Sequence, residues 1–161
     1  IVTATGLQLQ LLGGAEVVVD GEPVGFSQVF SYKGMMYSDV PNLASSFGYT
    51  NASWTLKSDL TCAYACKLLN YMDRHGYAEA RPRHPVQAAE APWLDFSSGY
   101  VQRSIHLFPK QADRAPWKQH QNYAQDLLAL RFGRLDDGAM AFRRRGEASA
   151  ASIEAEPRLA A

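Results

Sequence analysis

The longest regular pattern of apolar positions lies between Gly48 and Gly76. Apolar side chains recur there at three- and four-residue spacing, which is the period of an α-helix. Hydroxyl and amide side chains precede the pattern and suit helix N-caps, while Gly76 suits the left-handed position past a helix end. Polar residues form only a narrow strip, so we expect a central helix buried on most sides. The predicted buried face consists of Leu56, Leu60, Ala63, Tyr64, Leu68 and Tyr71.

Shorter apolar runs predict β-strands. Residues 1–6 form a β-branched run that ends on a glycine, and a native chain rarely begins inside a strand, so we expect a missing N-terminal portion. Asp20-Gly21 predicts a hairpin turn between residues 16–20 and a returning arm at 22–24. Further short strands are expected at 29–32, 43–47 and 139–142, further helices at 98–107 and 118–132, and an extended linker at 81–85.

The start of the long helix is the first candidate site. A strand, a glycine turn and a helix follow one another here, and α/β proteins place ligands at such strand ends. The free amides and partial positive charge of a helix start suit an anion or a carbonyl oxygen. Gly48, Ala52 and Ser53 would let a ligand approach the backbone, and Tyr49 and Trp54 would form an aromatic wall. A well-capped core helix beside a surface aromatic fits the same residues.

The composition excludes several classes of function. A chain of 161 residues fits one ordinary domain, and 47% hydrophobic with 20% charged residues is typical of a globular protein. Sixteen basic residues balance sixteen acidic ones, so no net field favours nucleic acid or an anionic membrane. No apolar run approaches the roughly 18 residues that a membrane span needs. Without a charged and then apolar leader, we expect a cytoplasmic protein.

The reactive side chains give no second strong candidate. Cys62 and Cys66 lie one helical turn apart, and we expect small packing residues in a reducing cytoplasm, with a redox pair as the alternative. The four histidines have no metal-ligand spacing, so no metal is expected. No G-x-S-x-G nucleophile motif occurs in the chain.

Several short motifs recur in an order typical of one enzyme family. Residues 3–6 read TATG, residues 32–36 read YKGMM, and residues 48–57 read GYTNASWTLK, which is the most specific block. Val40-Pro41-Asn42, Pro109-Lys110-Gln111, Pro116-Trp117 and Gln121-Asn122-Tyr123 complete the set. Together they resemble the C-terminal third of class B flavin-containing and Baeyer–Villiger monooxygenases, most closely the actinobacterial ethionamide-activating type. The resemblance runs from Ile1 to about Phe142.

The resemblance implies an α/β fold, the C-terminal part of a Rossmann-like FAD-binding, two-dinucleotide-binding fold. Short strands and a long central helix would be followed by an irregular C-terminal extension. Residues 1–6 would be the final strand and the ATG crossing from the NADPH domain, and residues 7–76 the C-terminal part of the FAD-binding domain. Residues 77–142 would be an extension packed on the core, and 143–161 a disordered tail.

The resemblance also implies an activity. Such enzymes use FAD, NADPH and O₂, and through a C4a-peroxyflavin they insert one oxygen atom into a small-molecule ketone, sulfide or amine. A flavin with negative charge on its ring would suit the amides at the helix start, whereas Lys57 would only pair with a surface carboxylate. The expected cofactor-binding residues are Thr5, Gly6, Tyr49, Thr50, Asn51, Ala52, Ser53, Trp54, Thr55 and Leu56.

The chain lacks the G-x-G-x-x-G motif that such enzymes carry for each dinucleotide. We therefore expect the catalytic residues upstream of Ile1, and a piece that alone binds FAD weakly and does not turn over. One alternative is a degenerate, non-catalytic interaction module derived from the same fold. Another is a thiol–disulfide flavoprotein that uses Cys62 and Cys66.

Overall fold

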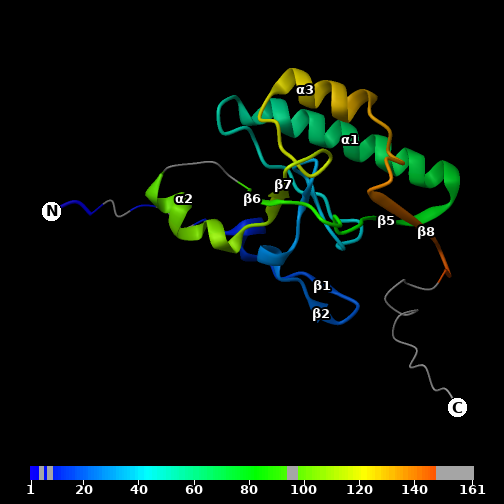
Figure 1. Ribbon diagram of the computed structural model, residues 1–161, viewed down its shortest axis with the longest axis horizontal. Helices are drawn as coiled ribbons and strands as arrows, with labels where there is room; N and C mark the ends of the chain where they lie inside the picture. Colours follow the sequence, from blue (N-terminus) through cyan, green and yellow to red (C-terminus); the bar gives the residue numbers. More distant parts are fainter. Residues whose placement is uncertain (4–5, 7–8, 94–97, 148–161) are drawn as a thin grey trace, which may run out of the picture.

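The computed structural model describes residues 1–3, 6, 9–93 and 98–147. Its longest element is helix α1 (Trp54–His75), which begins after Ser53 and ends at Gly76 with φ 67°. Both ends agree with the sequence prediction. Figure 1 shows α1 beside helix α3 (Tyr123–Leu127), with the short strands below the two helices.

Only one side of α1 packs against the rest of the described chain. The buried side chains point toward strand β5 and the segment of α3, and Leu60, Tyr64 and Leu68 confirm half of the predicted face. Leu56, Ala63 and both cysteines are exposed instead, so the expectation of a helix buried on most sides is wrong for this chain. The buried residues of α1 are Lys57, Leu60, Thr61, Tyr64, Leu68 and Met72.

The strands form four antiparallel pairs, each a separate two-stranded sheet. The hairpin turn is confirmed, because Asp20 and Gly21 both have positive φ, at 53° and 89°. Mixed helix and short strands agree with an α/β class, while a parallel Rossmann-like sheet does not form among the described residues. The pairs are β1 (Val18–Val19) with β2 (Glu22–Pro23), β3 (Ser31–Tyr32) with β4 (Met36–Tyr37), β5 (Tyr77–Pro82) with β8 (Met140–Arg144), and β6 (Glu90–Pro92) with β7 (Lys110–Ala112).

Other predictions hold in part. Helix α2 (Gly99–Ser104), continued by a 3₁₀ turn (Ile105–Leu107), confirms the helix expected at 98–107. Further 3₁₀ turns cover Leu11–Gly14 and Phe26–Gln28. The helix expected from residue 118 begins only at Tyr123, because Gln121 has φ 50° and Asn122 is the N-cap. It continues as one π-helical turn, Leu128–Phe132.

Three extended segments differ from expectation. The described residues of 1–6 are exposed and form no strand. Residues 43–47 make a single bridge, between Ala44 and Met36, instead of a buried strand. Arg81 and Pro82 were expected in a linker, but they pair with Ala141 and Met140 in β5, and β8 reaches two residues past the expected end at 142. The wrong segments lack the partner strands that would bury them. Among the described helices, none has the length and apolar character to cross a bilayer.

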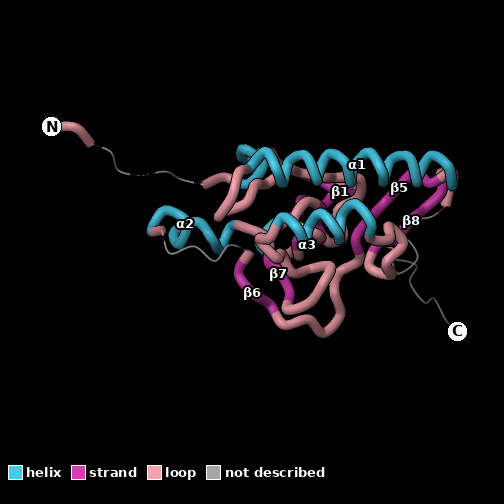
Figure 2. The backbone as a smooth tube through the Cα atoms, turned by 90° about the horizontal axis from the view of Figure 1, so that it is seen from above, coloured by secondary structure: helices cyan, strands magenta, loops and turns pink. Residues whose placement is uncertain are grey.

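The core is centred on the YKGMM residues between α1 and the strands. Tyr32, Met35 and Met36 are almost fully buried and cluster with Tyr64 and Leu68 of α1. Figure 2 shows α1 lying along the outside of this arrangement. The core therefore fixes one side of α1 and leaves the start of the helix at the surface.

A polar network closes this core toward the C-terminal extension. The Tyr32 hydroxyl donates to Oδ2 of Asp137 at 2.7 Å and lies 3.2 Å from the Tyr64 hydroxyl. Lys33 Nζ lies 2.9 Å from the same Asp137 oxygen. Burial raises the pKa of Tyr64 to about 12, so its hydroxyl stays protonated. For Asp137, burial raises the pKa, but the hydrogen bonds from Tyr32 and Lys33 and the charge of Lys33 outweigh it and leave the pKa below its ordinary value.

This network predicts a loss of stability in acid. Because the pKa of Asp137 is lower in the folded chain than in the unfolded chain, its contribution is complete above the ordinary value of 3.8 and is lost as the pH falls through the folded value. The contribution is about 1.5–3 kcal/mol, as for hydrogen bonds to a charged group. In urea unfolding, Asp137→Asn should be less stable than the native chain at pH 6 and nearly equal to it at pH 2. The exposed Asp136→Asn should show no such convergence, and parallel pH profiles for Asp137→Asn would contradict the assignment.

Candidate functional site

The candidate site is the turn of residues 48–53 that leads into α1. Residues 51–56 are all exposed, so the start of the helix is open to solvent. Ser53 makes no side-chain cap to the helix; its hydroxyl lies 2.7 Å from that of Thr55 instead. The first turn also contains no acidic residue. The amides and partial positive charge of the helix start therefore remain available to an anionic or carbonyl-bearing ligand.

Trp54 forms an aromatic wall at this turn. Its side chain is 56% exposed, and its ring lies 5.0 Å from that of Phe47, centroid to centroid. Gly48 permits this arrangement, because a Cβ on Gly48 would lie 2.1 Å from Cγ of Trp54. The glycine is thus required by the close approach of the indole, and the exposed face of the indole adjoins the open helix start.

Tyr49 does not form the second half of the wall, as the sequence suggested. Its side chain is buried, and its hydroxyl donates to Oδ2 of Asp126 at 2.7 Å. Burial and this hydrogen bond both raise the pKa of Tyr49, so the hydroxyl remains a donor. Tyr49 therefore anchors the turn from below and presents no ring to a ligand.

Lys57 shares the carboxylate that holds Tyr49. Its Nζ donates to the same Oδ2 of Asp126 at 2.8 Å, and the two side chains are only 6% and 10% exposed. The sequence suggested a surface carboxylate as the partner of Lys57, whereas the partner is buried. A buried pair of opposite charges is stable only while both members are present. The pair ties the first turns of α1 to α3.

Gln121 holds the turn from the other side. Its Oε1 accepts from the backbone N–H of Thr50 at 3.0 Å and lies 3.2 Å from the Thr50 hydroxyl. Its backbone oxygen accepts from Nδ2 of Asn51 at 3.1 Å. The C-terminal extension thus fixes both residues that precede the open helix start.

The predicted site residues divide into two groups in space. Residues 49–56 form one continuous turn, of which 51–56 are exposed. Gly6 lies instead beside α2, where a Cβ would approach Nη2 of Arg103 to 3.3 Å. Thr5 lies outside the described residues. Contact of any of these residues with a cofactor stays a prediction.

Two residues of this site escaped the sequence analysis. Gln121 belongs to a motif of the resemblance, but nothing in the sequence joins it to Thr50. Asp126 had a usable signal, because it follows Tyr123 by three residues and precedes Leu130 by four, which places a carboxylate on the face expected to be buried. Such an acid implies a buried cationic or hydrogen-bonding partner.

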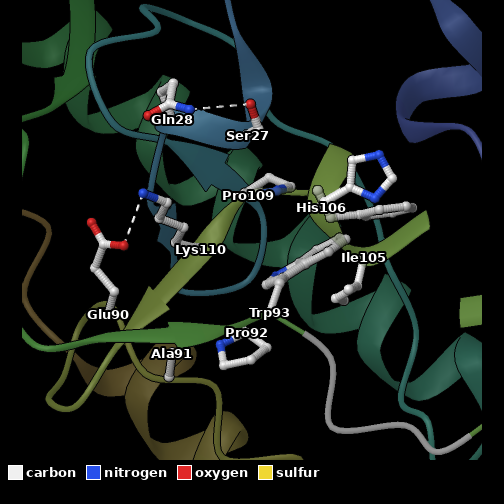
Figure 3. A pocket seen from close by; sticks show the side chains of 11 residues that line it. Ser27, Gln28, Glu90, Ala91, Pro92, Trp93, Ile105, His106, Pro109 and Lys110 are labelled. Carbon is white, nitrogen blue, oxygen red and sulfur yellow. Dashed lines mark hydrogen bonds and ion pairs between the residues drawn. The ribbon is translucent and has the colours of Figure 1, made fainter. Parts of the chain in front are cut away.

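A larger hollow lies close to the same turn. This pocket of about 500 Å³ contains Trp93, stacked on Phe108 with the ring centroids 5.4 Å apart, and at its edge the ion pair between Glu90 and Lys110 at 2.9 Å (Figure 3). The ring of Phe47 lies 4.6 Å from Trp93 and 5.0 Å from Trp54. The aromatic side chains therefore connect the pocket to the open helix start.

The chain is similar to known FAD-dependent proteins over most of its length. It is 46% identical over 153 residues to the FAD-containing monooxygenase EthA of Mycolicibacterium smegmatis, covering 94% of this chain and 31% of that protein. It is 48% identical over 148 residues to EthA of Mycobacterium tuberculosis, covering 90% of this chain and 30% of that protein. It is 46% identical over 144 residues to the probable FAD-binding monooxygenase AlmA of Acinetobacter baylyi, covering 88% of this chain and 29% of that protein.

The match covers this chain much more fully than it covers the relatives. The chain spans about a third of the length of these curated proteins. No protein-family model matches the chain, and no solved structure matches it significantly. The identity extends through the turn at 48–57 and the extension that holds it, since 94% of the chain is aligned. Over the residues that it spans, the chain belongs to the family of FAD-containing monooxygenases.

Proposed function

We propose that this chain is the C-terminal part of an FAD- and NADPH-dependent monooxygenase that transfers one oxygen atom from O₂ to a small-molecule ketone, sulfide or amine. The observation that carries the proposal is the open start of α1, next to an exposed indole, in a chain 46% identical to an FAD-containing monooxygenase. The Rossmann-like sheet, the NADPH domain and the catalytic residues belong to the part that the relatives have in addition. We therefore expect no turnover from this chain alone.

The residues present fit an isoalloxazine ring at the turn. The uncapped amides that begin α1 would stabilise negative charge on the pyrimidine edge of the ring. Trp54 would cover one side of the ring and exclude water there. Asp126 and Gln121 would hold the turn in place from the buried side. When bound, the flavin would supply the redox chemistry with O₂, and the protein would orient it and shape its electrostatics.

The proposal can be tested in a joined polypeptide, in which this chain is fused in one reading frame to the part of the M. smegmatis relative that lies outside the match. Replacing both Asn51 and Ser53 by leucine places bulky apolar side chains at the open amides. We expect FAD to bind about tenfold more weakly, a cost of about 1.4 kcal/mol, and NADPH oxidation to uncouple from oxygenation. Flavin absorbance after gel filtration and the ratio of product to NADPH consumed measure both effects.

The matched control replaces Asn70 and Asp73, two exposed polar residues near the other end of α1, by leucine. It should leave flavin binding and coupling unchanged. Equal flavin affinity in both double variants would contradict the placement of the turn. A joined polypeptide that folds without taking up FAD would favour the non-catalytic interaction module instead.

A further inference from the structure

One stripe of α1 faces no other element in the described part of the chain. Ser58, Cys62, Ala65 and Leu69 follow one another at helical spacing along it. Leu69 is 64% exposed, and Cys62 is an exposed free thiol. A helix on a protein surface normally carries charged residues on its solvent side. Small and apolar side chains at these positions are instead typical of a helix side that packs closely against another element.

The stripe borders an apolar groove. This groove has a volume of about 430 Å³ and lies between α1 and the segment that contains Asn42 and Ala44. Its lining is mainly apolar, with Met36 and Met72 at its base. Leu69 stands in the groove and on the stripe at once. The groove and the stripe therefore form one continuous surface.

The other wall of this surface is an incomplete strand edge. Burial alternates along residues 43–47, with Ala44 and Ser46 exposed, as in an extended strand. The segment has one bridge, to Met36, and one backbone hydrogen bond, from Ser45 N–H to the Met35 oxygen at 2.8 Å. Ser46 donates to the Ser58 hydroxyl at 2.8 Å, which links the edge to the stripe. The sequence predicts a buried strand here, and an edge with one partner is half of that prediction.

We infer that this surface, formed by residues 43–47 and the stripe of Ser58, Cys62, Ala65 and Leu69, receives a β-strand and its apolar side chains from the part of the monooxygenase chain that the relatives have in addition. The inference rests on the proposed function. The relatives are about three times as long as this chain, so a segment large enough to cover the surface exists in them. Strand addition would supply the missing backbone partners of residues 43–47, and the apolar side chains would cover α1.

Cys62 provides a direct reporter of this contact. In a Cys66→Ser background, Cys62 of the isolated chain should react with a maleimide at the rate of an exposed thiol. In the joined polypeptide the rate should fall at least tenfold, because the thiol is covered. The control is a cysteine at exposed Glu22 in the hairpin, in a chain that lacks both native thiols, and its rate should change less than twofold. Adding the remaining part of the relative in trans gives the same readout where the joined polypeptide is insoluble.

A matched pair of variants tests the apolar contact. Leu69→Asp puts a charge into the surface, whereas Leu128→Asp puts one at a leucine of nearly equal exposure, 64% against 62%. Both isolated variants should keep the circular dichroism spectrum and the unfolding midpoint of the parent. Leu69→Asp should restore the Cys62 reaction rate of the joined polypeptide at least fivefold toward that of the isolated chain, and Leu128→Asp should not.

The possible outcomes separate this inference from the proposed function. A joined polypeptide that protects Cys62 but neither binds FAD nor oxidises NADPH supports the interface and contradicts the function. One that binds FAD while Cys62 stays fully reactive overturns the interface and leaves the function standing. Protection of Cys62 in the isolated chain at high concentration, with a doubled mass in sedimentation, would assign the surface to a second copy and also overturn the inference.

Discussion

Replacing Asp126 by alanine should lower the free energy of unfolding of this chain by about 3–5 kcal/mol, because the change leaves the ammonium of Lys57 buried without a counterion. The Tyr49 hydroxyl loses its acceptor in the same variant. Two donors then point at an empty position in the least solvated part of the site. Urea unfolding followed by circular dichroism measures the loss. A cost of this size is a large fraction of the stability of an ordinary domain.

The double variant Lys57→Met with Asp126→Leu separates the charge pair from simple packing. Replacing both members of a buried ion pair by apolar side chains of similar size is often neutral or stabilising, so the double variant should recover most of the lost stability. Asp136→Ala, at an exposed aspartate 4.0 Å from Arg134, is the control and should cost less than about 0.5 kcal/mol. If Asp126→Ala costs less than about 1 kcal/mol, Lys57 reaches solvent and does not depend on the pair.

The helix and its caps could be predicted from sequence, because their signals are local. Glycine at position 76 adopts the left-handed conformation that ends α1, and Asp20-Gly21 forms the turn expected of that dipeptide. The same local reasoning overestimated the burial of α1. A narrow polar strip indicates how much of a helix is covered in the complete protein, and the described chain covers only one side of it. The exposed cysteines lie on the uncovered side.

The parts of the site that could not be predicted are long-range contacts. Thr50 and Gln121 are 71 residues apart, and Tyr49 and Asp126 are 77 apart, so no periodic pattern connects them. Strand β5 was also hidden, because its run from Tyr77 to Pro82 contains charged and proline residues and is stabilised by pairing with β8. Residues 43–47 show the opposite case, a local strand signal that lacks a full set of partners.

Replacing Gly48 by alanine should disrupt the candidate flavin turn while leaving the backbone conformation at residue 48 allowed. The added Cβ would lie 2.1 Å from Cγ and 2.6 Å from Cβ of Trp54, so the base of the indole, rather than its flexible end, must move. Such overpacking costs about 1–3 kcal/mol. In the joined polypeptide the displaced indole should also weaken FAD binding by about tenfold. Gly25→Ala, whose Cβ would meet only Cγ of Gln28 at 3.8 Å, should change neither quantity.

Adding Trp54→Ala to Gly48→Ala distinguishes the two roles that the indole has at this turn. If the cost of Gly48→Ala is the clash, removing the indole relieves it, and the unfolding free energy of the double variant should equal that of Trp54→Ala alone. FAD affinity should not recover, because the wall beside the ring is absent in both. Recovery of stability together with full flavin affinity would show that the indole does not touch the cofactor. The open amides of α1 would then remain as the only part of this turn that the flavin contacts.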